Sequence, residues 1–176
     1  IKYLLLFAVL LINITFFFKL TAAPFHFWSP DVYDGSPLSS TIIFTILPKV
    51  VFFTLLIRWL ISTFLLFFEF EYLFLVVGLC SVIFGIFFAL KQKHLKRFFI
   101  FSSIAQIGFI IAALSIQNLT VYTYIYFFLM NYIISSTLFW LFYIFFATTQ
   151  KNRFSFYSLL LNSLFISNLV NLNKFN

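Results

Sequence analysis

The sequence has few charged residues and a single cysteine, and each shortage excludes a class of protein. Only 9% of its 176 residues are charged and 64% are hydrophobic, with a mean hydropathy of +1.11. No soluble domain of this size could cover so much apolar surface. The one cysteine, Cys80, lies inside an apolar segment. It can form neither an intrachain disulfide nor a metal site with a second cysteine.

Motifs for redox chemistry, phosphate binding and nucleophilic catalysis are missing as well. The sequence has no glycine-rich phosphate loop, no cysteine cluster for iron–sulfur and no histidine pair for haem. The net charge is +7, but the basic residues cluster in connections and form no basic face on a soluble domain, as nucleic-acid binding requires. We therefore expect no cofactor or metal in this chain and no nucleic-acid partner.

What the sequence does have is a series of long apolar segments. Each is long enough to cross about 30 Å of hydrocarbon as a helix, and each is apolar on every face, unlike the strands of a membrane barrel. The sequence therefore predicts an all-α integral membrane protein, with residues 1–176 forming a single transmembrane domain of antiparallel neighbours. The six expected helices cover approximately residues 3–23, 38–61, 72–90, 96–116, 122–147 and 154–172.

The charges between these segments predict an orientation. The connections on one side contain Asp31, Asp34, Lys91, Lys93, Lys96, Arg97, Lys151 and Arg153. Those on the other side contain Lys2, Arg58, Glu69, Glu71 and Lys174. Because basic connections stay on the cytoplasmic side, residues 91–97 are expected on the cytoplasm-like face, which is the matrix in a mitochondrion. The 31 phenylalanines indicate an AT-rich genome, which favours an organellar origin.

Two lysines lie within the apolar segments. Lys19 is near the end of the first, and Lys49 is close to the middle of the second. A lysine at the bilayer centre costs about 2.5–3.5 kcal/mol on insertion scales, so it usually faces a protein interior or a wet cavity. Lys19 could instead extend its amine to the membrane surface, and Lys49 could belong to a purely structural ion pair.

A proline accompanies each lysine. Pro24 and Pro48 each remove a backbone N–H and clash with the carbonyl four residues earlier. Broken backbone at membrane depth is tolerated where protein or water satisfies it, and transporters build ion sites at such breaks. Burial lowers the pKa of a lysine, so a buried lysine can load and release a proton. The two lysine–proline pairs predict a polar pathway, although two incidental kinks would leave the same pattern.

Other polar residues could extend this pathway. His26 could relay a proton near neutral pH, or it could be a packing residue beside Trp28. Ser102, Ser103 and Gln106 could line a water path, or they could form interhelical hydrogen bonds. No acidic residue lies deep in any apolar segment. The carboxylate that a lysine pathway needs is therefore expected from another chain.

The motif "FKLTAAPFHFWSPDVYDGSP", followed by "PKV", resembles the subunit 2 family of the proton-pumping NADH:ubiquinone oxidoreductase, complex I. The stretch "LKRFFIFSSIAQIGF" is similar to a later motif of that family. The resemblance implies an antiporter-like bundle whose first helix here is broken. It also implies that Lys19 and Lys49 are proton-pathway lysines.

The chain departs from that family at three places. The helices that precede the motif in the family are missing, including the one with the glutamate partner of Lys19. We therefore expect a split subunit with its N-terminal half on a separate polypeptide. Gln106 stands where the family usually has histidine. The stretch "SNLVNLNKFN" could be a remnant of the family's twelfth helix, with Lys174 as its lysine.

The first interpretation is a membrane-arm subunit of complex I in the mitochondrial inner membrane, with Lys19, Lys49 and His26 as the proton pathway. The resemblance implies that NADH, FMN, iron–sulfur clusters and ubiquinone belong to other subunits, and that the partners are other membrane-arm subunits and lipid. Two alternatives remain open. The chain could be a membrane scaffold without a proton path, or a subunit of a cation/proton antiporter.

Overall fold

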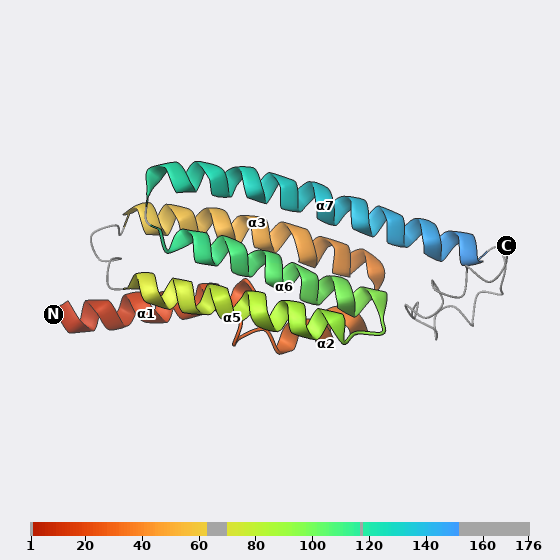
Figure 1. Cartoon of the computed structure of the whole chain (residues 1–176), viewed down its shortest axis with the longest axis horizontal. Coiled ribbons are helices and arrows are strands. Elements are labelled where there is room, and N and C mark those ends of the chain that lie inside the picture. Colours follow the sequence, from red (N-terminus) through yellow and green to blue (C-terminus); the bar gives the residue numbers. More distant parts are fainter. Residues whose placement is uncertain (1, 63–69, 117, 152–176) are drawn as a thin grey trace.

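The computed structural model describes residues 2–62, 70–116 and 118–151. These residues form a bundle of six α-helices (Figure 1): α1 Lys2–Lys19, α2 Trp28–Gly35, α3 Leu38–Ser62, α5 Glu71–Leu90, α6 Leu95–Leu114 and α7 Leu119–Lys151. Four helices are long and apolar enough to cross a membrane, within Leu38–Ser62, Glu71–Leu90, Leu95–Leu114 and Thr120–Ala147. The predicted all-α membrane bundle is confirmed, and these four helices agree closely with the predicted segments. The predicted helix over residues 154–172 lies outside the described residues, as do Glu69, Arg153 and Lys174.

The first predicted segment, residues 3–23, is wrong in its extent, because α1 already ends at Lys19. The helix stops in a Schellman motif: the N–H of Ala22 donates to the carbonyl of Phe17 at 2.9 Å, and the N–H of Thr21 donates to that of Phe18 at 3.2 Å. Thr21 takes the left-handed conformation, with a φ of 60°, which is unusual for a β-branched residue. The chain therefore leaves the helical path before it reaches Pro24.

The break lies deep in the bundle. The N–H of Ala23 donates to Ser81 Oγ at 2.9 Å, and Ser81 stands in the middle of α5. The chain then continues in α2, toward the end of the bundle where α5 meets α6 (Figure 1). The first part of the chain thus forms two helices, α1 and α2, separated by a break, as the resemblance implied. Asp31 and Asp34, expected in a connection, belong to the second of these helices.

The expected break at Pro48 is also wrong, since α3 stays helical from Leu38 to Ser62 with Pro48 inside it. A proline removes one hydrogen bond of the helix, and the surrounding contacts keep the rest in place. The hydroxyl of Tyr132 on α7 donates to the carbonyl of Thr45, one turn before the proline, at 2.9 Å. Helix α7 therefore supplies a polar contact where α3 is weakest.

Helices α5 and α6 pack closely through glycines. A Cβ placed on Gly78 would lie 2.6 Å from the backbone nitrogen of Ala112, and one on Gly85 would lie 2.7 Å from that of Ala105. A Cβ on Gly108 would meet the carbonyl oxygen of Gly78 at 2.8 Å. Real Cβ atoms do not come so close, so these three glycines set the distance between the two helices.

Candidate functional site

Lys49 lies in the interior of the bundle, with 2% of its surface exposed. Its Nζ donates a hydrogen bond to Ser103 Oγ on α6 at 2.8 Å. Ser103 Oγ in turn donates to the carbonyl of Ile100 at 2.7 Å. The Ser103 hydroxyl therefore donates its proton to the backbone and accepts a hydrogen bond from the Lys49 ammonium. The prediction that Lys49 faces a protein interior agrees with this position.

Helix α7 forms the other wall around Lys49. The Nζ atom lies 5.7 Å from the centre of the Tyr132 ring, within the range of a cation–π interaction. Besides the hydroxyl of Tyr132, the indole of Trp140 reaches α3, because its Nε1 donates to Thr45 Oγ1 at 3.1 Å. Thr45 is itself fully buried. Two aromatic side chains of α7 thus hold the turn of α3 that precedes Lys49.

An ammonium has three protons to donate, and Ser103 accepts one of them. In the part of the chain that the structure describes, the ion pairs of the carboxylates Asp31 and Asp34 are made with Arg97 and none is made with Lys49. This agrees with the sequence, which has no acidic residue deep in an apolar segment. A charged Lys49 therefore needs an anionic or water partner besides the residues described.

Lys19 has quite different surroundings. It is the last residue of α1, immediately before the break, and its side chain is exposed on the outside of the described bundle. Because the break meets the middle of α5, Lys19 lies well inside the length of the bundle (Figure 1). The structure therefore does not bring Lys19 and Lys49 into one cluster.

His26 lies in the connection between α1 and α2 and is only 3% exposed. Its ring stacks on Phe27 with centroids 4.6 Å apart, and on Phe84 at 6.1 Å. Phe88 and Phe101 are also near it. The imidazole Nδ1 is buried and has no hydrogen-bond partner among the described residues. His26 therefore combines an aromatic setting with one polar atom that the described chain leaves unsatisfied.

Of the three α6 residues expected to line a polar path, only Ser103 is fully buried against Lys49. Ser102 and Gln106 are partly exposed; Ser102, one position from Ser103, points to a different side of the helix. The structure thus narrows the predicted set to one serine.

Sequence reasoning missed a charged cluster between α2 and α6. Arg97 Nε donates to Asp34 Oδ2 at 2.7 Å, and Arg97 Nη2 lies 3.6 Å from Asp31 Oδ1. The Nζ of Lys96 donates to the carbonyls of Asp34 and Ser36 at 3.1 and 2.8 Å, so this cation satisfies the C-terminal end of α2. The signal was present, because these acidic and basic residues were expected on the same side of the membrane.

A second missed residue is Asn13, on the buried face of α1. It is completely buried, and neither its Nδ2 nor its Oδ1 has a hydrogen-bond partner within the described residues. Leaving a buried polar group unsatisfied costs about 1–3 kcal/mol. An asparagine inside an apolar segment was a sufficient signal for interhelical hydrogen bonding.

Within residues 2–62, 70–116 and 118–151, no group of three or more His, Cys, Asp or Glu residues lies close enough to hold a metal ion. The polar group in hydrogen-bond contact with the Lys49 amine is the Ser103 hydroxyl, and the Tyr132 ring lies beside the amine.

Comparison with known proteins gives a consistent result. The family described as NADH:quinone oxidoreductase/Mrp antiporter, TM, matches residues 2–172. NADH-quinone oxidoreductase subunit N of Pelagibacter ubique is 39% identical over 131 residues, which are 70% of this chain and 28% of the relative. NADH-ubiquinone oxidoreductase chain 2 of Marchantia polymorpha is 36% identical over 126 residues, or 67% of this chain and 25% of the relative. NADH-ubiquinone oxidoreductase chain 2 of Rhizopus oryzae is 39% identical over 120 residues, which are 63% of this chain and 21% of the relative. The chain thus spans about a quarter of the length of these relatives.

Proposed function

The chain belongs to the NADH:quinone oxidoreductase/Mrp antiporter transmembrane family, and we propose that it works as part of a membrane-arm subunit of a proton-translocating NADH:quinone oxidoreductase, complex I. The motifs around Lys19 and Lys49 predicted this family, and the prediction is confirmed. The names of the relatives, subunit N and chain 2, support subunit 2 as the position of this chain in the complex. It contributes to the NADH:quinone reductase reaction as a proton-translocating part without its own redox centre.

The observation that supports this function best is the contact between Lys49 and Ser103. As an ammonium, Lys49 donates to the serine oxygen, as seen in the structure. As an amine, it accepts the hydroxyl proton that Ser103 now donates to Ile100. A hydroxyl rotates freely and can serve as donor or acceptor, so the contact persists in both protonation states. Lys49 can therefore load and release a proton without losing its position on α6.

Lys19 and His26 complete the proposed pathway. Lys19 faces outward at the break of the first crossing, where a carboxylate from helices outside this sequence can approach it. The length of the relatives that this chain does not cover supports such helices. His26 exchanges protons through the Nδ1 that has no partner in the described residues.

NADH, FMN, iron–sulfur clusters and ubiquinone are assigned to other subunits of the complex. The relatives named NADH-ubiquinone oxidoreductase chain 2, from a plant and a fungus, support the mitochondrial inner membrane as the location. The orientation follows from the basic connection between α5 and α6, which faces the matrix.

The decisive experiment replaces Lys49 by Ala in the native complex and measures proton uptake per NADH oxidised in sealed membrane vesicles. We expect the complex to assemble, with proton uptake per NADH clearly reduced. Arg58→Ala is the matched control, because Arg58 is an exposed cation on the same helix, and it should leave the ratio unchanged. Unchanged proton uptake in Lys49→Ala would refute the proton pathway.

Two other functions are distinguished by the same experiment. Loss of assembly in Lys49→Ala with normal pumping in the remaining complex indicates a scaffold in which Lys49 is structural. The family also includes Mrp antiporters, and an antiporter subunit would exchange cations for protons without NADH. Native electrophoresis separates this case, because a complex I subunit must migrate with NADH-oxidising activity. Mass spectrometry of that band also identifies the polypeptide with the remaining helices.

A further inference from the structure

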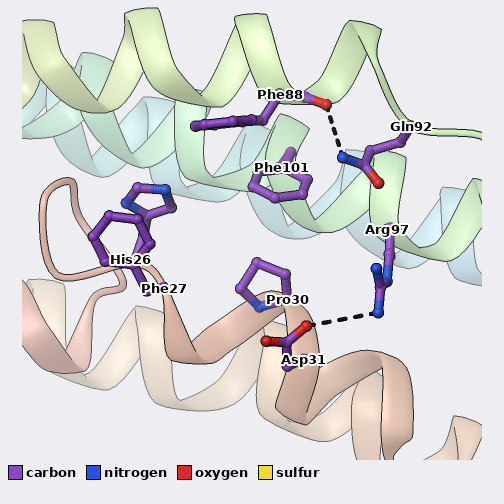
Figure 2. Close-up of a pocket in the computed structure, with 8 residues that line it drawn as sticks. All are labelled: His26, Phe27, Pro30, Asp31, Phe88, Gln92, Arg97 and Phe101. Atoms are coloured by element: carbon purple, nitrogen blue, oxygen red, sulfur yellow. Dashed lines mark hydrogen bonds and ion pairs between the residues drawn. The ribbon is translucent and has the colours of Figure 1, made fainter.

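A pocket of about 300 Å³ opens between α2 and the end of the bundle where α5 joins α6 (Figure 2). Its inner wall is aromatic and includes Phe88 of α5 and Phe101 of α6, with His26 beside them. Its outer part is polar and includes Gln92 of the α5–α6 connection, Arg97 of the first turns of α6 and Asp31 of α2, which pairs with Arg97. The pocket is therefore apolar toward the membrane interior and polar toward the membrane surface.

The polar part of the pocket retains hydrogen-bonding capacity. Arg97 has five N–H donors, and its contacts with Asp34 and Asp31 occupy two of its nitrogens. The amide nitrogen of Gln92 donates to the carbonyl of Phe88 at 3.1 Å, which leaves the amide oxygen directed elsewhere (Figure 2). The unused hydrogen-bonding groups of the pocket therefore lie at its outer end, near the membrane surface.

The charge around the mouth is positive. Lys91 and Lys93 are exposed in the connection beside Gln92, and they add to Arg97. The neighbouring carboxylates, Asp31 and Asp34, balance only part of this charge. The outer surface beside the mouth is also apolar, with Phe27 72% exposed and Leu90 78% exposed. A ligand that suits this site has a negative head and an apolar body.

We propose that this pocket binds an anionic phospholipid. Basic pockets between transmembrane helices on the matrix or cytoplasmic side bind anionic lipid head groups. The phosphate lies at the mouth against Arg97 and the two exposed lysines, and the glycerol region lies beside Gln92. One acyl chain follows the aromatic wall and then the exposed apolar surface. This assignment does not depend on proton transport through Lys49.

The test uses the intact complex purified in mild detergent and two photoactivatable lipids that differ only in head group. One is phosphatidylglycerol and the other is phosphatidylcholine, each with a diazirine in one acyl chain. After irradiation, mass spectrometry of the peptides that cover residues 84–101 measures labelling. We expect phosphatidylglycerol to label these peptides several times more strongly. Equal labelling by both lipids, or no labelling, would overturn the proposal.

Two sets of variants sharpen the test. Lys91→Gln and Lys93→Gln should each lower labelling by phosphatidylglycerol by about fivefold, the contribution of one lysine near an anionic surface. Arg58→Gln, at the opposite end of the bundle, should leave it unchanged. Gln92→Trp should fill the mouth and abolish labelling while the complex still assembles. Unchanged labelling in all of the pocket variants would overturn the proposal.

Inorganic phosphate distinguishes a lipid site from a general anion site. At millimolar concentration it should not reduce labelling, because a free anion lacks the apolar body that the aromatic wall contacts. If phosphate competes fully with the lipid, the pocket is an anion site and the lipid assignment is wrong. If both lipids label another subunit but not these peptides, protein covers the pocket and the assignment is equally wrong.

Discussion

Lys19 and Lys49 each have a proline nearby, but their surroundings differ in almost every respect. Near Lys19 the helix stops, and the lysine is left exposed at its end. Near Lys49 the helix continues through Pro48, and the lysine is buried against Ser103. The helix is therefore interrupted next to the exposed lysine and continuous around the buried, hydrogen-bonded lysine. The described chain surrounds Lys49 with side chains of α6 and α7, whereas the side chain of Lys19 is exposed.

This difference follows from what each region packs against. Helix α3 lies between α6 and α7, and side chains of both helices contact the turns around Pro48. The break after α1 bonds to α5, through the hydrogen bond from Ala23 to Ser81, and Leu20 and Ala22 are buried in the main core cluster. The backbone of the break is thus held inside the bundle, whereas the Lys19 side chain just before it is exposed.

The largest expected effect comes from Lys49→Arg compared with Lys19→Arg. Arginine does not deprotonate at physiological pH, and a bulkier group does not fit easily at a fully buried position. We expect Lys49→Arg to reduce NADH-driven proton uptake by more than half. Lys19→Arg should have a smaller effect, because its side chain has room to move. Proton uptake per NADH oxidised, measured for both variants in sealed vesicles, checks the comparison. Equal losses in the two variants would contradict it.

The next largest effect is expected on the stability of the break between α1 and α2. Ser81→Ala removes the acceptor of the Ala23 N–H and leaves a buried donor unpaired, at a cost of about 1–3 kcal/mol. The chain should leave the complex at a lower temperature, as followed by native electrophoresis after heating. Ser135→Ala is the control, since this hydroxyl bonds only to a carbonyl of its own helix. A midpoint that falls equally in both variants would mean that the bond to Ala23 does not stabilise the break.

A smaller effect is expected on the α3 side. Tyr132→Phe removes the hydroxyl that donates to Thr45, which should cost about 0.5–1.5 kcal/mol. The ring that faces Lys49 remains, so proton uptake should change little. The same heating experiment measures the loss, with the 72% exposed Tyr124 changed to Phe as the control. A large loss of proton uptake would show that the hydroxyl takes part in the pathway.

The smallest expected effect has the opposite sign. Thr21→Gly relieves the left-handed strain of a β-branched residue, worth about 1–2 kcal/mol, and loses part of this gain to the entropy of glycine. We expect a net stabilisation of about 0.5 kcal/mol. Thr15→Gly, within α1, should destabilise by about 0.3 kcal/mol, the difference between the two helix propensities. If both substitutions lower the temperature at which the chain leaves the complex, the turn at Thr21 is not strained.

Much of this arrangement could be predicted from the sequence, because a bilayer constrains helices strongly. The length of each apolar segment predicted the four long helices nearly to the residue, and the cost of a buried charge predicted the interior position of Lys49. Pro48 was misleading, because proline removes only one hydrogen bond and the tertiary contacts that hold α3 together are not visible in the sequence. The early end of α1 was missed for a related reason, since Thr21 is not a residue that favours the left-handed conformation.

The details of the site were harder to predict. The sequence suggested Ser102, Ser103 and Gln106 equally, and only the rotation of α6 against α3 selects Ser103. The aromatic rings around His26 come from three separate segments of the chain. The roles of Lys19, Lys49 and His26 in proton transfer stay predictions. So does the separate chain that would supply the remaining helices.

The glycine contacts between α5 and α6 have a consequence for energy conservation. A membrane that stores a proton gradient must not let protons leak back, and a file of water molecules between two helices would be such a leak. With Gly78 and Gly108 in backbone contact with the facing helix, no space for water remains at these points along the seam. At these points the seam between α5 and α6 therefore gives protons no water-filled route across the membrane.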